Sequence, residues 1–181
     1  MLLNRNITNR ISSIILLFTV SCFAAKGAPM SLFSTTKEVV LSSPMEGTLT
    51  LNGKPAAGIK IERRLKWFDG KDSNTDFVVT KNNGHFTLPA IKQTLKINAL
   101  THFLISQDLV VMHQGEEISI WYMSKGSKIE YGELGGKPIN LRCEITDEER
   151  ASHDYNNPIM TRCVWDGLEP WTDTEYPTEN K

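Results

Sequence analysis

Apolar and polar side chains alternate along residues 45–67, and a period of two is typical of half-buried β-strands. The segment MEGTLTL at 45–51 alternates cleanly, and IKIERRLKW at 59–67 repeats the pattern after the turn NGKP at 52–55. Arg63 breaks the phase of the second segment. The pattern predicts an antiparallel hairpin, with a bulge or a sheet edge at Arg63.

A second turn signal follows at 82–84, where Asn-Asn-Gly supplies the positive φ angles of a tight turn. Alternating apolar residues precede and follow this turn within residues 77–88. These residues are therefore expected to form another hairpin.

Residues 91–113 fit neither the helical nor the strand period cleanly, so they allow either a short helix or two strands. We favour strands, with residues 109–112 and 118–123 forming a hairpin across Gln114-Gly115. Residues 124–136 are expected to form a glycine-rich, charged loop.

The spacing of Thr146 and Glu149 matches a capping box, which predicts one helical turn at 147–151. Together with the strand patterns, this predicts an all-β protein, an antiparallel β-sandwich with at most one short helix.

The segment NGKPAAGIKI followed by TKNNGHFTLP resembles the carboxypeptidase-regulatory-like, or transthyretin-like, sandwich domains of many secreted bacterial proteins. Their usual pattern is Gly-x-Pro-x-x-Gly-x-x-Val followed by Thr-Asp-x-x-Gly-x-Phe, and this chain has Lys81 where Asp is common. The resemblance implies a transthyretin-like or Ig-like sandwich and carries no catalytic residue across. The residues that carry it are Gly53, Pro55, Gly58, Ile61, Thr80, Gly84 and Phe86.

Later segments extend the resemblance. ISIWYMSK, GELGGKPINLRCEITDEE and RCVWDG are similar to a small bacterial family of unknown function built on that sandwich. The resemblance covers residues 30–167. Its motifs are turn and core signals, so it implies architecture only.

The N-terminus predicts export. Arg5 and Arg10 precede an uncharged apolar run that ends in small residues, so residues 1–25 are expected to form a secretory signal peptide. Three alternatives are retention of this run as a membrane anchor, lipid anchoring through Cys22, and a cytoplasmic protein that starts at Met30. We expect a periplasmic or secreted protein with a linker at 26–36, a sandwich domain at 37–167 and a flexible acidic tail at 168–181.

The composition excludes one class of partner. The formal net charge is −1, so nothing in the chain is basic enough to bind nucleic acid through its phosphates.

Cys143 and Cys163 share the buried phase of their strand patterns. Two buried thiols in an oxidising compartment are expected to form a disulfide. Unpaired core thiols are the alternative.

Metal and catalytic signals are sparse. The oxygen-rich loop with Asp69, Asp72, Asn74 and Asp76 is a calcium candidate at most, because it lacks EF-hand spacing and a solvated hairpin tip explains the same residues. The four histidines do not show the spacing of a zinc site. The chain lacks a Gly-x-Ser-x-Gly elbow. We expect no cofactor and no enzymatic activity.

Large apolar side chains occupy both faces of the strand that begins at Glu117. Trp121 and Met123 share the face opposite Ile118, Ile120 and Tyr122. Either the tail or the following loop covers the second face, or that face binds a partner. The partner-binding hypothesis comprises Trp121, Met123, Tyr131 and, as a docking anchor in the tail, Trp171.

These observations favour an exported, non-catalytic β-sandwich that binds another protein, either an envelope component or a toxin that it neutralises. One alternative is a carbohydrate- or peptidoglycan-binding module that stacks sugars on Trp121 with Tyr131 or Tyr122. The other is a hydrolase of transthyretin-like fold.

Overall fold

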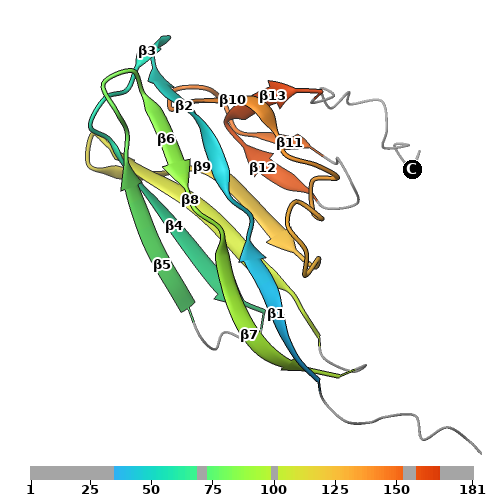
Figure 1. Cartoon of the computed structure of the whole chain (residues 1–181). Helices are drawn as coiled ribbons and strands as arrows, with labels where there is room; N and C mark the ends of the chain where they lie inside the picture. The colour runs from blue at the N-terminus through green and yellow to red at the C-terminus, as the bar shows by residue number, and fades with distance from the viewer. Residues whose placement is uncertain (1–34, 69–72, 99–101, 153–157, 168–181) are drawn as a thin grey trace, which may run out of the picture. The chain divides into compact units, whose positions relative to one another are not determined.

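The computed structural model describes residues 35–68, 73–98, 102–152 and 158–167, which all lie in one compact unit, residues 33–181. These residues form strands, turns and loops without a helix, which confirms the predicted all-β fold. None of them forms a helix able to span a membrane. The strands are β1 (Thr35–Ser42), β2 (Met45–Leu51), β3 (Lys54–Pro55), β4 (Lys60–Trp67), β5 (Ser73–Val79), β6 (His85–Leu88), β7 (Ile91–Ile97), β8 (Ile105–His113), β9 (Glu116–Lys125), β10 (Ile139–Glu144), β11 (Arg150–Ser152), β12 (Ile159–Thr161) and β13 (Cys163–Asp166) (Figure 1).

One layer of the sandwich is built on a long two-stranded ribbon. β2 pairs with β6 from Met45 opposite Leu88, and β1 pairs with β7 beyond it, with a shift in register between Val40 and Ser42. Pro44 and Pro89 lie at the break between the two ladders, because proline has no N–H to donate. On its other side β2 pairs in parallel with β10, and β10 pairs with β13.

The second layer is the antiparallel sheet β11-β12-β9-β8-β4-β5. The predicted hairpin across residues 114–115 is confirmed, and its strands β8 and β9 form the centre of this sheet. The sandwich prediction is also confirmed, since side chains from both layers pack into shared clusters.

The predicted hairpin of residues 45–67 is wrong. The chain turns at Asn52 and Gly53, whose φ angles are 51° and 74°, but only the two-residue strand β3 pairs back onto β2. β4 belongs to the other layer, where it lies between β5 and β8. The turn signal therefore located the chain reversal but not the sheet that the next strand joins.

Residues 77–88 do not form a hairpin either, because β5 pairs with β4 while β6 pairs with β2 in the other layer. The predicted turn is present. Gly84 has a φ angle of 75°, and a Cβ atom there would lie 2.3 Å from the carbonyl oxygen of Leu49. Glycine has no Cβ and permits this close approach to the Leu49 carbonyl. The turn thereby connects β5 in one layer with β6 in the other.

The predicted helical turn at 147–151 does not form, and β11 begins within it at Arg150. A capping box requires the side chain of Thr146 to accept a hydrogen bond from the backbone three residues later. Instead, the hydroxyl and amide of Thr146 donate to the Glu144 carboxylate at 2.6 and 3.1 Å. This competing interaction explains why the prediction is wrong.

Two clusters of buried apolar side chains lie between the layers. β4 and β8 contribute side chains to both clusters. In the facing layer, β2 contributes to the larger cluster and β1 to the smaller one, so the clusters follow each other along the strands. The larger cluster includes Met45, Leu49, Ile61, Phe86, Leu109 and Cys143, and the smaller includes Val39, Leu41, Leu65, Ile97, Phe103 and Ile105.

A belt of buried polar side chains separates the clusters. Arg63 on β4, Gln107 on β8 and Ser42 at the end of β1 interrupt the apolar inner faces of their strands. Arg63 donates to Asp76 at 2.8 and 2.5 Å, to Ser42 Oγ at 3.0 Å and to the Pro89 carbonyl at 2.8 Å. Ser42 donates to Gln107 at 2.6 Å.

The predicted bulge or edge at Arg63 is therefore wrong. β4 pairs with both β5 and β8 through Arg63 without a shift in register, and the side chain is 0% exposed. A buried guanidinium is tolerated here because Asp76 and two neutral oxygens accept its hydrogen bonds.

A second buried ion pair, Lys125 with Glu133, extends the belt. Lys125 also donates to the Ile129 carbonyl at 2.7 Å, and Ser43 Oγ donates to Glu133 at 2.7 Å. Burial lowers the pKa of Lys125, and the neighbouring Glu133 opposes this effect. These contacts attach the loop after β9 to the sandwich.

Candidate functional site

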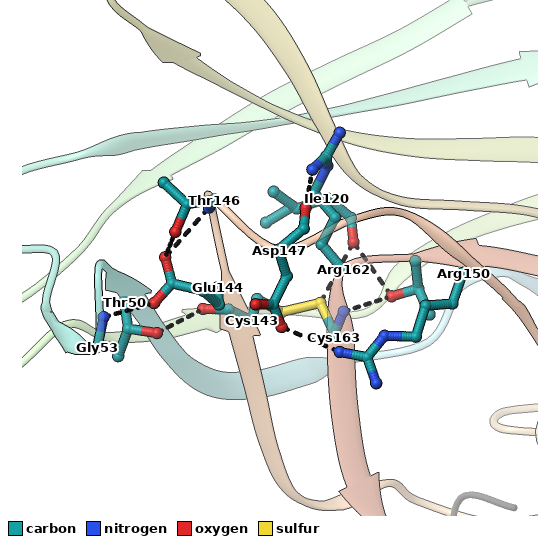
Figure 2. Close-up of polar contacts among 11 residues, drawn as sticks. Thr50, Gly53, Ile120, Cys143, Glu144, Thr146, Asp147, Arg150, Arg162 and Cys163 are labelled. Atoms are coloured by element: carbon teal, nitrogen blue, oxygen red, sulfur yellow. Dashed lines mark hydrogen bonds and ion pairs between the residues drawn. A yellow bond between two sulfur atoms is a disulfide. The ribbon is translucent and has the colours of Figure 1, made fainter. Parts of the chain in front are cut away.

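The predicted disulfide is confirmed. Cys143 on β10 lies opposite Cys163 on β13, and their sulfur atoms are bonded (Figure 2). Both residues are buried in the larger cluster. The two cysteines are 20 residues apart in the sequence, and their bond holds β13 onto β10 in the first layer.

Glu144, next to the disulfide, binds the turn between β2 and β3. Its carboxylate accepts hydrogen bonds from the amide of Asn52 at 2.9 Å. It also accepts from the amide of Gly53 at 2.9 Å and from Thr146 (Figure 2). Partial burial raises the pKa of Glu144, but hydrogen bonds from Thr146 and Gly53 outweigh burial and lower it to about 2. The residue acts as an anionic clamp between β10 and the turn.

This clamp predicts a pH-dependent stability. The pKa of Glu144 is below its ordinary value of 4.5, so its stabilisation is present above pH 4.5 and is lost as the pH falls toward 2. We expect Glu144→Gln to lower the free energy of unfolding by about 1–2 kcal/mol at pH 7. This loss is smaller than the pKa shift alone would give, because the side chain is partly exposed and solvent screens its interactions. Urea unfolding at pH 7 and pH 2.5 measures this, and an equal loss at both values would contradict it.

Trp121 and Met123 do not form the surface patch predicted for them. Both are core residues, with exposures of 0% and 1%. The pairing of β8 with β9 shifts between Leu109 and Val110, so Ile120 is an extra residue on β9. This β-bulge lets Ile120 and Trp121 both face the core. The partner-binding prediction is therefore wrong for Trp121 and Met123.

A contact from a distant segment accompanies the bulge. The Ile120 carbonyl accepts hydrogen bonds from the Arg162 amide at 3.0 Å and from Thr161 Oγ1 at 3.1 Å. Arg162 is where the chain passes from β12 in one sheet to β13 in the other. The bulge thus coincides with the crossing of the chain between layers.

Of the other two predicted partner-binding residues, the structure describes Tyr131 only. Tyr131 is half-buried in the loop after β9, where its amide donates to Ser43 Oγ at 2.8 Å. Trp171 lies outside the described residues. Tyr122 is exposed on the outer face of β9.

The calcium candidate is only partly described. Asp69 and Asp72 lie outside the described residues, and Asn74 is exposed on β5. Asp76 is already bound to Arg63. Within the described ranges, no group of three or more histidine, cysteine or acidic side chains could hold a metal ion.

Exposed apolar side chains instead gather on the outer face of the six-stranded sheet. Phe77 and Val79 on β5 are 62% and 51% exposed, and Met112 on β8 is 53% exposed. Lys60 on β4 lies opposite Val79, with its Nζ 4.8 Å from the centre of the Phe77 ring. We refer to Phe77, Val79, Met112 and Lys60 as the β5 surface.

Charged side chains flank this surface on β4. Glu62 binds Lys60 at 2.9 Å and Arg64 at 2.7 Å, and Arg64 also binds Glu117 at 2.6 Å. Hydrogen bonds from Arg64 lower the pKa of Glu62 and of Glu117. With Lys66 added, the exposed side chains of β4 carry more positive than negative charge.

A cleft of about 250 Å³ opens between the two layers beside β5. Asn74 of β5, Lys66 of β4 and Lys92 and Gln93 of β7 supply polar groups, and apolar side chains supply the rest of the lining. The apolar lining residues are Leu41, Leu65, Trp67 and Ile105.

A second hollow, of about 360 Å³, lies over β2, β6 and the start of β10. Its titratable groups are Glu46, His85 and Lys137, with Glu46 3.2 Å from His85 and 3.4 Å from Lys137. Hydrogen bonds from His85 and Lys137 lower the pKa of Glu46. Because titratable groups line this hollow, the hydrolase alternative stays a prediction.

No curated protein and no solved structure matches the chain. A family model described as Domain of unknown function (DUF6795) matches residues 45–148. That range begins with β2 and includes the disulfide residue Cys143 and the clamp residue Glu144. The chain belongs to the DUF6795 family.

Proposed function

We propose that this protein is an exported, non-catalytic β-sandwich that binds another protein through the β5 surface. The observation that carries the proposal is a seven-residue edge strand with large apolar side chains on its exposed face. Exposed apolar groups at an unpaired sheet edge are typical of surfaces that pair with another chain.

The described residues of β5 lack the features that usually protect an edge strand. The ladder with β4 has no bulge, and the one charged residue of the strand, Asp76, is bound to Arg63. By contrast, β7 carries exposed Lys92 and Lys96, and β3 and β11 are only two and three residues long. Charge and short length both discourage pairing at an edge.

Export is supported by the predicted signal peptide at 1–25 and by the buried disulfide, since disulfides persist in oxidising compartments. A transthyretin-like sandwich in the periplasm is the setting we propose. The partner is then an envelope component or a toxin. The carbohydrate-binding alternative has lost its main stacking platform, because Trp121 is buried.

The proposal predicts that Phe77→Ser with Val79→Ser reduces partner capture from an envelope extract by about tenfold or more. Burial of each apolar side chain contributes about 1.5–3 kcal/mol, and about 1.4 kcal/mol corresponds to a tenfold change in affinity. The C-terminally tagged, oxidised protein serves as bait, and mass spectrometry quantifies the captured protein.

Ile139→Ser provides the matched control, because Ile139 is 60% exposed and lies on β10 in the other layer. This variant should capture the same protein as the wild type does. Equal capture by the β5 double variant, with its thermal unfolding unchanged, would sink the proposal.

A further inference from the structure

We infer that the partner contributes an extended segment that adds to β5 as a further strand, with one apolar side chain in the cleft and acidic side chains near its lysines. This inference rests on the proposed function and specifies the chemistry of the partner. Three features carry it: the backbone of β5, the two faces beside it, and the charge around it.

The backbone groups of β5 alternate between β4 and the free edge. The Thr80 amide donates to the Ile59 carbonyl at 3.0 Å, and the Phe68 amide donates to the Leu104 carbonyl at 3.1 Å. These bonds show that odd-numbered residues of β4 bond to β5 and even-numbered ones to β8. Hydrogen-bonded and non-bonded pairs alternate in antiparallel sheets. The N–H and C=O groups of residues 75, 77 and 79 therefore point away from β4.

Residues 75, 77 and 79 are thus available to a new strand, and Phe77 and Val79 also place their side chains on the exposed face. The described strands include none that pairs with this edge of β5. A strand added there would gain main-chain hydrogen bonds and an apolar platform together. In strand addition, the main chain supplies affinity and pockets for alternate side chains supply specificity.

The cleft supplies such a pocket on the inner face. Asn74 faces inward on β5 and lines the cleft, so an inward side chain of an added strand would enter beside it. Whole small-molecule ligands occupy pockets of about 300–1,000 Å³. At about 250 Å³, with Leu65, Trp67 and Ile105 in its lining, the cleft suits one large apolar side chain.

The positive charge near the cleft favours acidic residues in the partner segment, next to its apolar side chain. Lys66 and Lys92 line the cleft, and Lys60 lies over Phe77 at the outer face. Acidic side chains in the added segment would meet complementary charge on both faces. Such contacts are screened by salt, so the affinity should fall as ionic strength rises.

The test uses a library of ten-residue peptides displayed on phage and selected on the oxidised full-length protein. The enriched peptides should share one large apolar residue with aspartate or glutamate at positions on either side of it. Thr75→Pro removes an N–H that points to the free edge and leaves the β4 ladder intact. Relative to the control Thr75→Val, it should weaken peptide affinity by about tenfold, because the main-chain hydrogen bond from residue 75 is lost and its acceptor on the added strand is left unpaired.

If Thr75→Pro does not fold, Val79→Pro replaces it, with Val79→Thr as its control, because both N–H groups face the same edge. Absence of enriched peptides, or enriched peptides that bind the proline and control variants equally, would overturn the inference. Conversion of a wild-type dimer to a monomer by Thr75→Pro would also overturn it, because a second copy then occupies the edge. If Phe77 and Val79 are needed for capture but the proline variant binds normally, the proposed function holds and strand addition fails.

Discussion

Replacing Lys125 with methionine is expected to lower the free energy of unfolding by about 3–5 kcal/mol. The substitution keeps most of the side-chain volume but leaves Glu133 buried without its cationic partner. The two side chains are 1% and 3% exposed, so water cannot solvate the remaining carboxylate. Urea unfolding at pH 7, followed by tryptophan fluorescence, measures the loss.

A double variant distinguishes the cost of a stranded charge from the loss of packing. Adding Glu133→Gln removes the buried charge and retains an oxygen that can accept from Ser43, which lies 2.7 Å from Glu133. The double variant should therefore recover at least half of the stability lost by Lys125→Met. If both variants are equally unstable, packing of the Lys125 stem dominates and our account of the belt is wrong.

The second large effect concerns the disulfide. Replacing both Cys143 and Cys163 with alanine should lower the free energy of unfolding by about 3 kcal/mol, because the bond closes a short loop in the unfolded chain. Reduction of the wild-type protein should give a similar loss, measured by urea unfolding with and without reductant. The double variant should be insensitive to reductant.

Material purified without reductant should show no free thiol at either position, which alkylation and mass spectrometry can check. Alkylation of both cysteines in unreduced, natively exported protein would contradict the disulfide and remove a main support for export.

Local patterns in the sequence predicted strands and turns well but not their partners. The hairpin of β8 and β9 followed from alternation and a two-residue turn, both of which are local signals. The turns at Gly53 and Gly84 were also located correctly. The predicted pairings of β4 with β2 and of β6 with β5 were wrong. A turn determines where the chain reverses, whereas the layer that the next strand joins depends on the whole sheet.

Buried charge was hidden from the sequence for a related reason. Arg63 looked like a break in phase, yet it continues the buried phase because Ser42, Asp76 and Pro89 surround its guanidinium. These partners lie 13 to 26 residues away along the chain. No periodicity within one strand reports such contacts.

The candidate site was misplaced through one inserted residue. Alternation assigned Trp121 and Ile120 to opposite faces, and the bulge at Ile120 puts both in the core. Phe77 and Val79 are the apolar pair that is exposed. Their period-two spacing in the sequence is the same as that of a buried pair, so the pattern does not distinguish the two cases. The packing of the two layers leaves these side chains exposed, and the order of strands puts β5 at the sheet edge; neither can be read from one strand of sequence. The disulfide was predictable because both cysteines kept the phase of their strands.

Amide hydrogen exchange shows whether the free edge of β5 is the surface that binds the partner (Figure 1). In the free protein, the amides of Thr75, Phe77 and Val79 should exchange rapidly, while those of Asp76 and Val78, which face β4, should be protected. Binding of the captured partner should protect the first set and leave the second unchanged. Protection of Phe77 and Val79 already in the free protein, or unaltered exchange in the complex, would contradict the account.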